Sequence, residues 1–441
     1  MLVFAHGIVG RADLPIPAEL FGAAAAAVLV LSFAALASQW SEPRLQRPRE
    51  RRLFRLPRAV DVVAGAFGLA VFLVCVYAGL AGVQGERDNL APWMVYVAFW
   101  VGVPCASLLA GDVWRLLSPW RAAGRAVGAI AGRGGRSLPE VLPYPERLGR
   151  IPAAVGLVGF GICELCWGAA REPATLAILM LVYTVVMLVG MSLYGVEPWS
   201  RNADAFGVYF GLFGRLAPIA RHDGVLYARP PIVGATGLAT PRATTAVILC
   251  GIGITAFDGA SEGPLFNDLV QSLQDAFTGL GFAPAVALEL GFTAGLLGVI
   301  GLVALLWALG IAGMPGRPSA QLAHALIPIL AAYVVAHYFS LLAYSGQDLA
   351  RLASDPLGDG SDLFGGAGAT IDYGVVSATA IWYVQVAALV LGHVAALVLA
   401  HDRALVLYAS HREATRSQVV MLLMMVCFTF LGLWLLSAAN A

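Results

Sequence analysis

The chain has 441 residues, of which 59% are hydrophobic and only 12% are charged, whereas a soluble globular domain carries roughly a quarter charged residues. This composition excludes a soluble enzyme and indicates that lipid covers much of the surface of the folded chain. The formal net charge is zero, from 27 basic and 27 acidic residues, and every basic residue is an arginine because the sequence contains no lysine.

Ten apolar stretches are candidates for membrane-spanning helices, because a span needs about 20 largely apolar residues. We therefore predict an all-α fold, a polytopic transmembrane helix bundle in which residues 1–441 form a single integral membrane domain. The sixth stretch is short for a span. The predicted spans cover residues 16–38, 60–82, 92–113, 151–169, 174–196, 243–257, 283–314, 322–345, 373–400 and 419–437.

The arginines are distributed unevenly over the loops that these spans define. Alternate loops hold 23 of the 27 arginines, and the other set holds only Arg11, Arg87, Arg171 and Arg351. Since arginine-rich loops stay in the cytoplasm, the sequence predicts a plasma-membrane protein with both termini outside the cytoplasm. A nucleic-acid partner is not indicated, because the arginines are scattered over five loops without interleaved aromatic residues.

Two segments outside the spans have the periodicity of amphipathic helices. We predict that both are short helices lying in the membrane interface, the second as a lid over the outer ends of spans six and seven. The inner loop 114–150 lacks apolar periodicity and is expected to be a solvated connector that touches anionic head groups. The two apolar faces consist of Phe206, Tyr209, Phe210 and Phe213, and of Phe266, Leu269, Val270, Leu273 and Phe277.

Ionisable side chains within the spans are the main candidates for function, because burying them in lipid costs several kcal/mol unless they are paired or face a cavity. Glu164, Asp258, Glu262 and Glu289 lie in the outer third of their spans. Counting about 1.5 Å per residue, His337 lies about 12 Å below the outer edge of span eight. Four carboxylates and one imidazole at similar depth are expected to form one outward-facing site.

Span eight carries a polar stripe that is expected to face protein rather than lipid. Its polar residues recur every three or four positions, which places them on one helical face, and span nine adds Trp382, Gln385 and His393. Two interpretations are open for the stripe: part of a functional site, or hydrogen bonding between helices of a packed bundle. The stripe consists of Tyr333, His337, Ser340, Tyr344 and Gln347.

A bis-histidine haem is one cofactor to consider, because spans eight and nine carry two histidines each. Thirteen residues separate His324 from His337, and eight separate His393 from His401, so the depths match for one haem at most. Thirteen residues also turn a helix by about 220°, which places His324 and His337 on nearly opposite faces. The sequence therefore argues against haem.

Several long segments of the chain are similar to one known family. On these segments the chain resembles a family of polytopic actinobacterial membrane proteins known as fenitrothion hydrolases, and the resemblance runs along most of the chain. It implies an organophosphate-cleaving membrane enzyme. The segments are AHGIVGRADLPIP, PWSRNADAFGVYFGLFGRLAPIA, FDGASEGPLF, HALIPILAAYVVAHYFSLLAYSGQ, GHVAALVLAHDRAL and SQVVMLLMMVCFTFLGLWLLSAAN.

Phosphotriester cleavage needs a nucleophilic water and positive charge near the phosphoryl oxygen, and a divalent metal ion held by carboxylates and imidazole supplies both. In this interpretation Asp258, Glu289 and His337 are the metal ligands. Glu262 or Glu164 is then the catalytic base, and an apolar ester reaches the site through the outer leaflet. The sequence contains no close His-x-His pair and no HExxH motif, which are typical of metal hydrolases.

Two other classes of function use the same residues. In a proton- or cation-coupled transporter or channel, the intramembrane acids and His337 form an ion relay, and the glycines of spans six to eight permit helix movement. In a membrane scaffold subunit of a metalloenzyme or redox complex, the polar stripe is a protein interface. The partner besides lipid is accordingly a small apolar ester, an ion or another protein.

Overall fold

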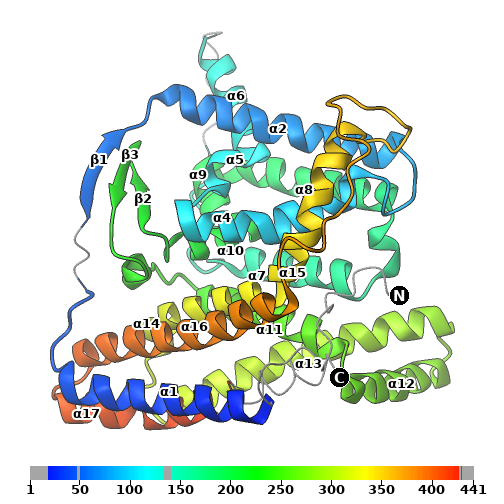
Figure 1. Cartoon of the computed structure of the whole chain (residues 1–441). Coiled ribbons are helices and arrows are strands. Elements are labelled where there is room, and N and C mark those ends of the chain that lie inside the picture. The colour runs from blue at the N-terminus through cyan, green and yellow to red at the C-terminus, as the bar shows by residue number, and fades with distance from the viewer. Residues whose placement is uncertain (1–17, 47–49, 134–140, 427–428, 430–441) are drawn as a thin grey trace.

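The computed structural model describes residues 18–46, 50–133, 141–426 and 429, which form a bundle of apolar helices (Figure 1). Among them, eight helices are long and apolar enough to cross a membrane, as expected of the predicted all-α, multi-pass bundle. These are α1 (Ala18–Gln39), α2 (Arg58–Ala81), the helix formed by α3 (Leu90–Trp93), η2 (Met94–Gly102) and α4 (Val103–Ala110), α8 (Pro173–Tyr194), α11 (Thr244–Ser261), α13 (Pro284–Ala312), the helix formed by α14 (Ser319–Leu322), η5 (Ala323–Leu326) and α15 (Ile327–Ser354), and α16 (Ala378–Leu407).

The predicted count of ten spans is not confirmed. The fourth predicted span, 151–169, forms α7 (Ile151–Leu165), whose 15 residues are fewer than the roughly 20 that a span needs. The tenth, 419–437, is helical over residues 419–426, and most of its remainder lies outside the described residues. The remaining short helices are α5 (Trp114–Leu117), α6 (Pro119–Arg133), η3 (Gly168–Arg171), α9 (Val196–Asn202), α10 (Ala205–Gly214), η4 (Val233–Gly237), α12 (Pro264–Gly279) and α17 (His411–Ser417).

The connecting segments gather at two opposite ends of the bundle (Figure 1). One end, here called the basic end, carries an antiparallel sheet of β1 (Arg51–Arg55), β3 (Val225–Ala228) and β2 (Ile219–His222), in that order. The other, here called the acidic end, carries the loop 355–377. The sheet is an addition to the predicted all-α fold: its strands have four or five residues, and β1 pairs with a strand far along the chain.

The first predicted interfacial helix is a core helix instead. α10 begins after Asp204, whose carboxylate accepts hydrogen bonds from a backbone N–H of the first turn. Tyr209 and Phe213 are fully buried, and Tyr209 stacks on Trp100 with ring centroids 5.1 Å apart. The prediction was wrong because α10 is apolar on every side, and such a helix is stabilised by burial among other helices.

The second predicted amphipathic helix is present as α12. Phe266 and Val270 are buried, and they pack against α13 where Gly295 and Gly291 leave room for them. α12 therefore forms a hairpin with α13 at the acidic end and has few contacts with α11, unlike the predicted lid over the ends of both helices.

The predicted solvated connector 114–150 begins with helical structure, in α5 and α6. The first half of α6 packs against α2, because Gly65 lets the Ala122 side chain approach closely. The second half exposes Val127 and Ile130. The apolar positions Trp120, Val127 and Ile130 do follow helical spacing, but alanines and glycines between them conceal the pattern.

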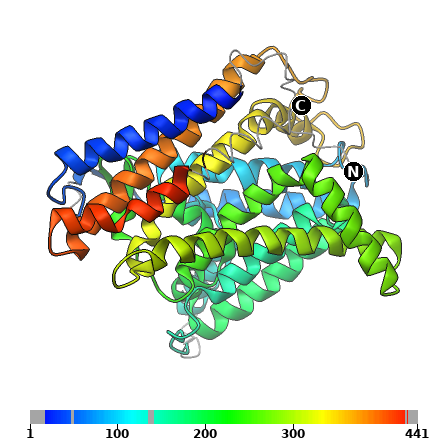
Figure 2. The same cartoon turned by 90° about the horizontal axis from the view of Figure 1, so that it is seen from below.

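The side chain of Asp402 fixes the segment after α1 to α16. Its carboxylate is fully buried and accepts hydrogen bonds from the backbone N–H groups of Arg44 and Leu45 and from the side chains of Trp40 and Gln46. These four hydrogen bonds replace those that the carboxylate would make with water, so its charge can be buried. Figure 2 shows α1 lying beside α16, with this anchored segment at the basic end.

Candidate functional site

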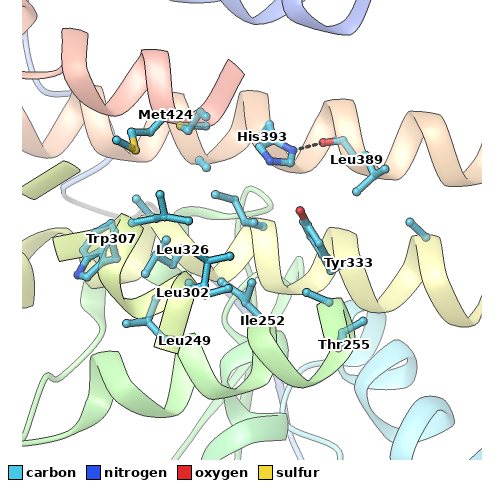
Figure 3. A pocket seen from close by; sticks show the side chains of 18 of the residues that line it. Leu249, Ile252, Thr255, Leu302, Trp307, Leu326, Tyr333, Leu389, His393 and Met424 are labelled. Atoms are coloured by element: carbon cyan, nitrogen blue, oxygen red, sulfur yellow. Dashed lines mark hydrogen bonds between the residues drawn. The ribbon is translucent and has the colours of Figure 1, made fainter. Parts of the chain in front are cut away.

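A cavity of about 370 Å³ lies between α11, α13, α15 and α16 (Figure 3). Its wall is mainly apolar, and Tyr333 and His393 lie across it from each other with ring centroids 6.4 Å apart. His393 donates a hydrogen bond from Nδ1 to the Leu389 carbonyl at 2.7 Å. The volume is in the range of small-molecule sites. The polar residues in the wall are Thr255, Glu262, Tyr333, His337, Ser340, Gln385, His393 and Gln418.

Two helices bring a histidine and an aspartate together beside this cavity. Nε2 of His337, on α15, lies 2.9 Å from Oδ2 of Asp258, on α11. The Tyr338 hydroxyl donates to the same oxygen at 2.7 Å. Because a carboxylate only accepts hydrogen bonds, His337 holds a proton on Nε2 whenever Asp258 is ionised. The side chains of His337 and Asp258 are only 15% and 10% exposed.

A second carboxylate, Glu164 near the end of α7, lies within electrostatic range of Asp258. Its Oε2 is buried and has no hydrogen-bond partner among the described residues. The hydroxyl of Tyr209 interacts electrostatically with Glu164, and Tyr209 stacks on Trp100. An unpaired buried polar atom costs about 1–3 kcal/mol, so the position of Glu164 beside Asp258 needs a functional explanation.

The other two predicted carboxylates lie in different surroundings. Glu262 follows the last turn of α11, is exposed, and lines the cavity within electrostatic range of His337. Glu289 does not join the pair, because its Oε1 accepts a hydrogen bond from the Gly168 N–H at 3.1 Å. Equal depth along a helix did not ensure that Glu289 points the same way as Asp258.

These positions can be compared with the predicted metal site. Asp258 and His337 lie together, but Glu289 is not with them. Among the described residues, no group of three or more His, Cys, Asp or Glu side chains is arranged to hold a metal ion. The residues present therefore do not fit the three-ligand site that we predicted.

The polar stripe on α15 faces protein along its whole length, as predicted. Tyr333, His337 and Ser340 line the cavity. Further along, the Tyr344 hydroxyl donates to the Val376 carbonyl at 2.8 Å, and the amide of Gln347 exchanges hydrogen bonds with the backbone of residue 372. Three residues of the stripe thus border the cavity, and the other two hold the loop at the acidic end rather than a neighbouring helix.

Tyr338 is part of the site and was not predicted from the sequence. It lies about 100° around α15 from His337 and hence outside the stripe. Asp258 lies between these two directions and accepts hydrogen bonds from both side chains. The available indication was a tyrosine directly adjacent to an intramembrane histidine, since one facing acid can contact both.

Comparison with known proteins identified no relative of this chain. No protein-family model, no curated protein and no solved structure matches it. Its function must therefore be inferred from the side chains of this site and from the cavity beside them.

Proposed function

We propose that the protein is a proton-coupled membrane transporter of a small, uncharged, apolar molecule. The supporting observation is the His337–Asp258 pair, which lies inside the bundle and borders a largely apolar cavity. Ionisable pairs in the membrane interior are costly, and in membrane proteins they typically mark proton or substrate pathways.

The pair has the chemistry of a proton carrier. Imidazole titrates near physiological pH, and an adjacent carboxylate stabilises the imidazolium. Loss of one proton from His337 changes the pair from neutral to negative, and the Nε2 hydrogen bond to Asp258 persists in both states. Since a net charge disfavours burial of an apolar molecule beside it, proton binding and ligand binding reinforce each other.

Two further carboxylates lie within electrostatic range of the pair. Glu262 is exposed at the end of α11 and lies within electrostatic range of His337, so it connects the pair to water. Glu164 is buried and interacts with Asp258. In this proposal the two residues that we predicted as catalytic bases exchange protons with the pair, Glu262 from the exposed side and Glu164 from a buried position.

The organophosphate hydrolase implied by the family resemblance makes a different demand on the same cavity. It requires a metal-bound water and therefore a third ligand beside Asp258 and His337. The transporter uses only groups that already meet in the structure, and for this reason we place it first.

Reconstituted protein tests the transporter directly. In proteoliposomes that contain a pH indicator, the uncharged dye phenylnaphthylamine is expected to enter faster with an imposed pH gradient than without one, together with protons. Metal content and turnover of a chromogenic phosphotriester are measured on the same preparation. Stoichiometric metal with ester cleavage and no proton-linked uptake would refute the transporter and support the hydrolase.

We also propose that the chain has ten spans, with α7 and the helix starting at residue 419 as the two additional ones. The basic end then faces the cytoplasm of the plasma membrane and both termini lie outside, which the division of the arginines supports.

Cysteine labelling tests this orientation. Arg52→Cys and Arg201→Cys at the basic end, and Phe364→Cys at the acidic end, all replace exposed side chains. With an impermeant maleimide on intact cells, only Phe364→Cys is expected to react above the level of the unsubstituted protein, and all three are expected to react after permeabilisation. Reaction of Arg52→Cys or Arg201→Cys in intact cells would reverse the orientation.

A further inference from the structure

A second cavity, of about 550 Å³, lies in the other half of the bundle between α2, η2, α7 and α8. Its wall is made almost entirely of apolar and aromatic side chains. Phe67, Val182 and Val186 belong to this wall and are also exposed on the outside of the bundle. The cavity therefore opens sideways, toward the lipid that surrounds the spanning helices.

A cluster of three arginines lies at the basic end of the same helices. Arg115, Arg121 and Arg125 place a guanidinium nitrogen 3.3, 2.6 and 2.7 Å, respectively, from the carboxylate of Glu197. Burial raises the pKa of Glu197, but Arg121 and Arg125 lower it, with a net result of about 2. Glu197 is therefore ionised, and three guanidinium groups around one carboxylate leave this cluster positive.

The cavity and the arginine cluster share two short helices. Trp114 and Trp120 line the cavity, and each is followed in sequence by an arginine of the cluster. α5 and α6 cross α2 here, because Gly68 allows the Leu117 backbone to approach. Arg121 is buried, whereas the side chains of Arg115 and Arg125 are about half exposed.

The free half of α6 has the character of an interfacial helix. Val127 and Ile130 are 59% and 68% exposed, and α6 extends beyond the other helices at the top of Figure 1. α6 contains three arginines and no acidic residue. Helices with arginines and exposed apolar side chains lie at the boundary between head groups and acyl chains.

We propose that this region is a binding site for one anionic phospholipid, with an acyl chain in the cavity and the phosphate beside Arg115 and Arg125. The apolar cavity opens to lipid, and the arginines lie at the end where a head group would be. Guanidinium groups bind phosphate oxygens in bidentate geometry. The site uses none of the residues assigned to proton transfer.

Native mass spectrometry of the purified full chain tests the site, with dioleoyl phosphatidylglycerol as the anionic lipid and dioleoyl phosphatidylcholine as its zwitterionic counterpart. The wild type is expected to bind the anionic lipid more tightly. Each arginine near an anionic surface strengthens binding by about fivefold, so the Arg115→Gln/Arg125→Gln variant is expected to bind it about 25-fold more weakly. Arg201→Gln, an exposed arginine of α9, is the matched control and is expected to bind like the wild type.

A second variant tests the cavity separately from the charge. Gly159 lines the cavity, and a Cβ there would meet no atom within 4 Å. Gly159→Leu should therefore fold and fill part of the cavity, so that phosphatidylglycerol binds more weakly while glycerol phosphate is unaffected. Equal binding of both lipids by the wild type, or equal loss in Arg201→Gln, would overturn the proposal. So would glycerol phosphate binding as tightly as the lipid, since it would make this a site for free phosphates.

Discussion

Replacing Asp258 with asparagine is expected to lower proton-linked uptake by about 100-fold or more, the scale on which a positioned acid or base contributes to proton transfer. Asparagine has nearly the same shape, but it carries no charge to stabilise the His337 imidazolium 2.9 Å away. Uptake in proteoliposomes at several pH values measures the effect. The wild type should show a pH dependence that the variant lacks.

Tyr338→Phe is the matched control, since it removes a hydrogen bond to the same Asp258 oxygen and leaves the carboxylate charge. One such hydrogen bond contributes about 0.5–1.5 kcal/mol, so uptake should fall by only about two- to thirteenfold. His337→Gln separates the two proposed functions. If it removes bound metal and ester turnover, the protein is a hydrolase, and if all three variants transport like the wild type, the pair is only a link between helices.

Gly68→Ala is expected to destabilise the protein by about 3 kcal/mol or more, at the upper end of the cost of overpacking. A Cβ at this position would lie 1.8 Å from the Leu117 carbonyl oxygen and 2.8 Å from its carbon. Both atoms belong to the backbone, so α2 and α5 would have to move apart. A lower melting temperature and a lower yield of detergent-purified protein measure the effect.

Gly298→Ala in α13 is the control for the same exchange in another spanning helix. A Cβ there would meet no atom within 4 Å, and alanine is the better helix former by roughly 0.5–1 kcal/mol. This variant should be as stable as the wild type or more so. If both variants lose stability equally, contact with Leu117 is not the reason for glycine at position 68.

Hydrophobicity along the chain predicted the helices well, because the length of a span depends only on the thickness of the membrane. It also placed Asp258 and His337 at similar depth, and these two side chains do meet. The direction in which a side chain points around the helix axis, relative to a neighbouring helix, depends on how the helices pack. The local sequence does not determine it. For that reason Glu289 was grouped with the pair, although it hydrogen-bonds Gly168, and Tyr338 was left out.

The amphipathic pattern was informative only where water or head groups are present on one side. It identified α12 correctly. It failed for α10, since a helix buried inside a membrane protein needs no polar face. The β2–β3 hairpin could have been predicted from its sequence, because Asp-Gly is a typical pair for a two-residue turn in which both residues have positive φ. Asp223 and Gly224 do have positive φ in the structure.

The hydrogen bonds between residues 40–46 and Asp402 can form only late in the synthesis of the chain. The side-chain and backbone hydrogen bonds involved join positions 356 to 362 residues apart. At roughly 5–20 residues per second of synthesis, α16 follows α1 out of the ribosome about 20 to 70 seconds later. During that interval the first helix has no access to its final partner. Until α16 is made, α1 is therefore stabilised by its apolar surface in lipid and by the insertion machinery. The packing of α1 against α16 is completed only at the end of synthesis.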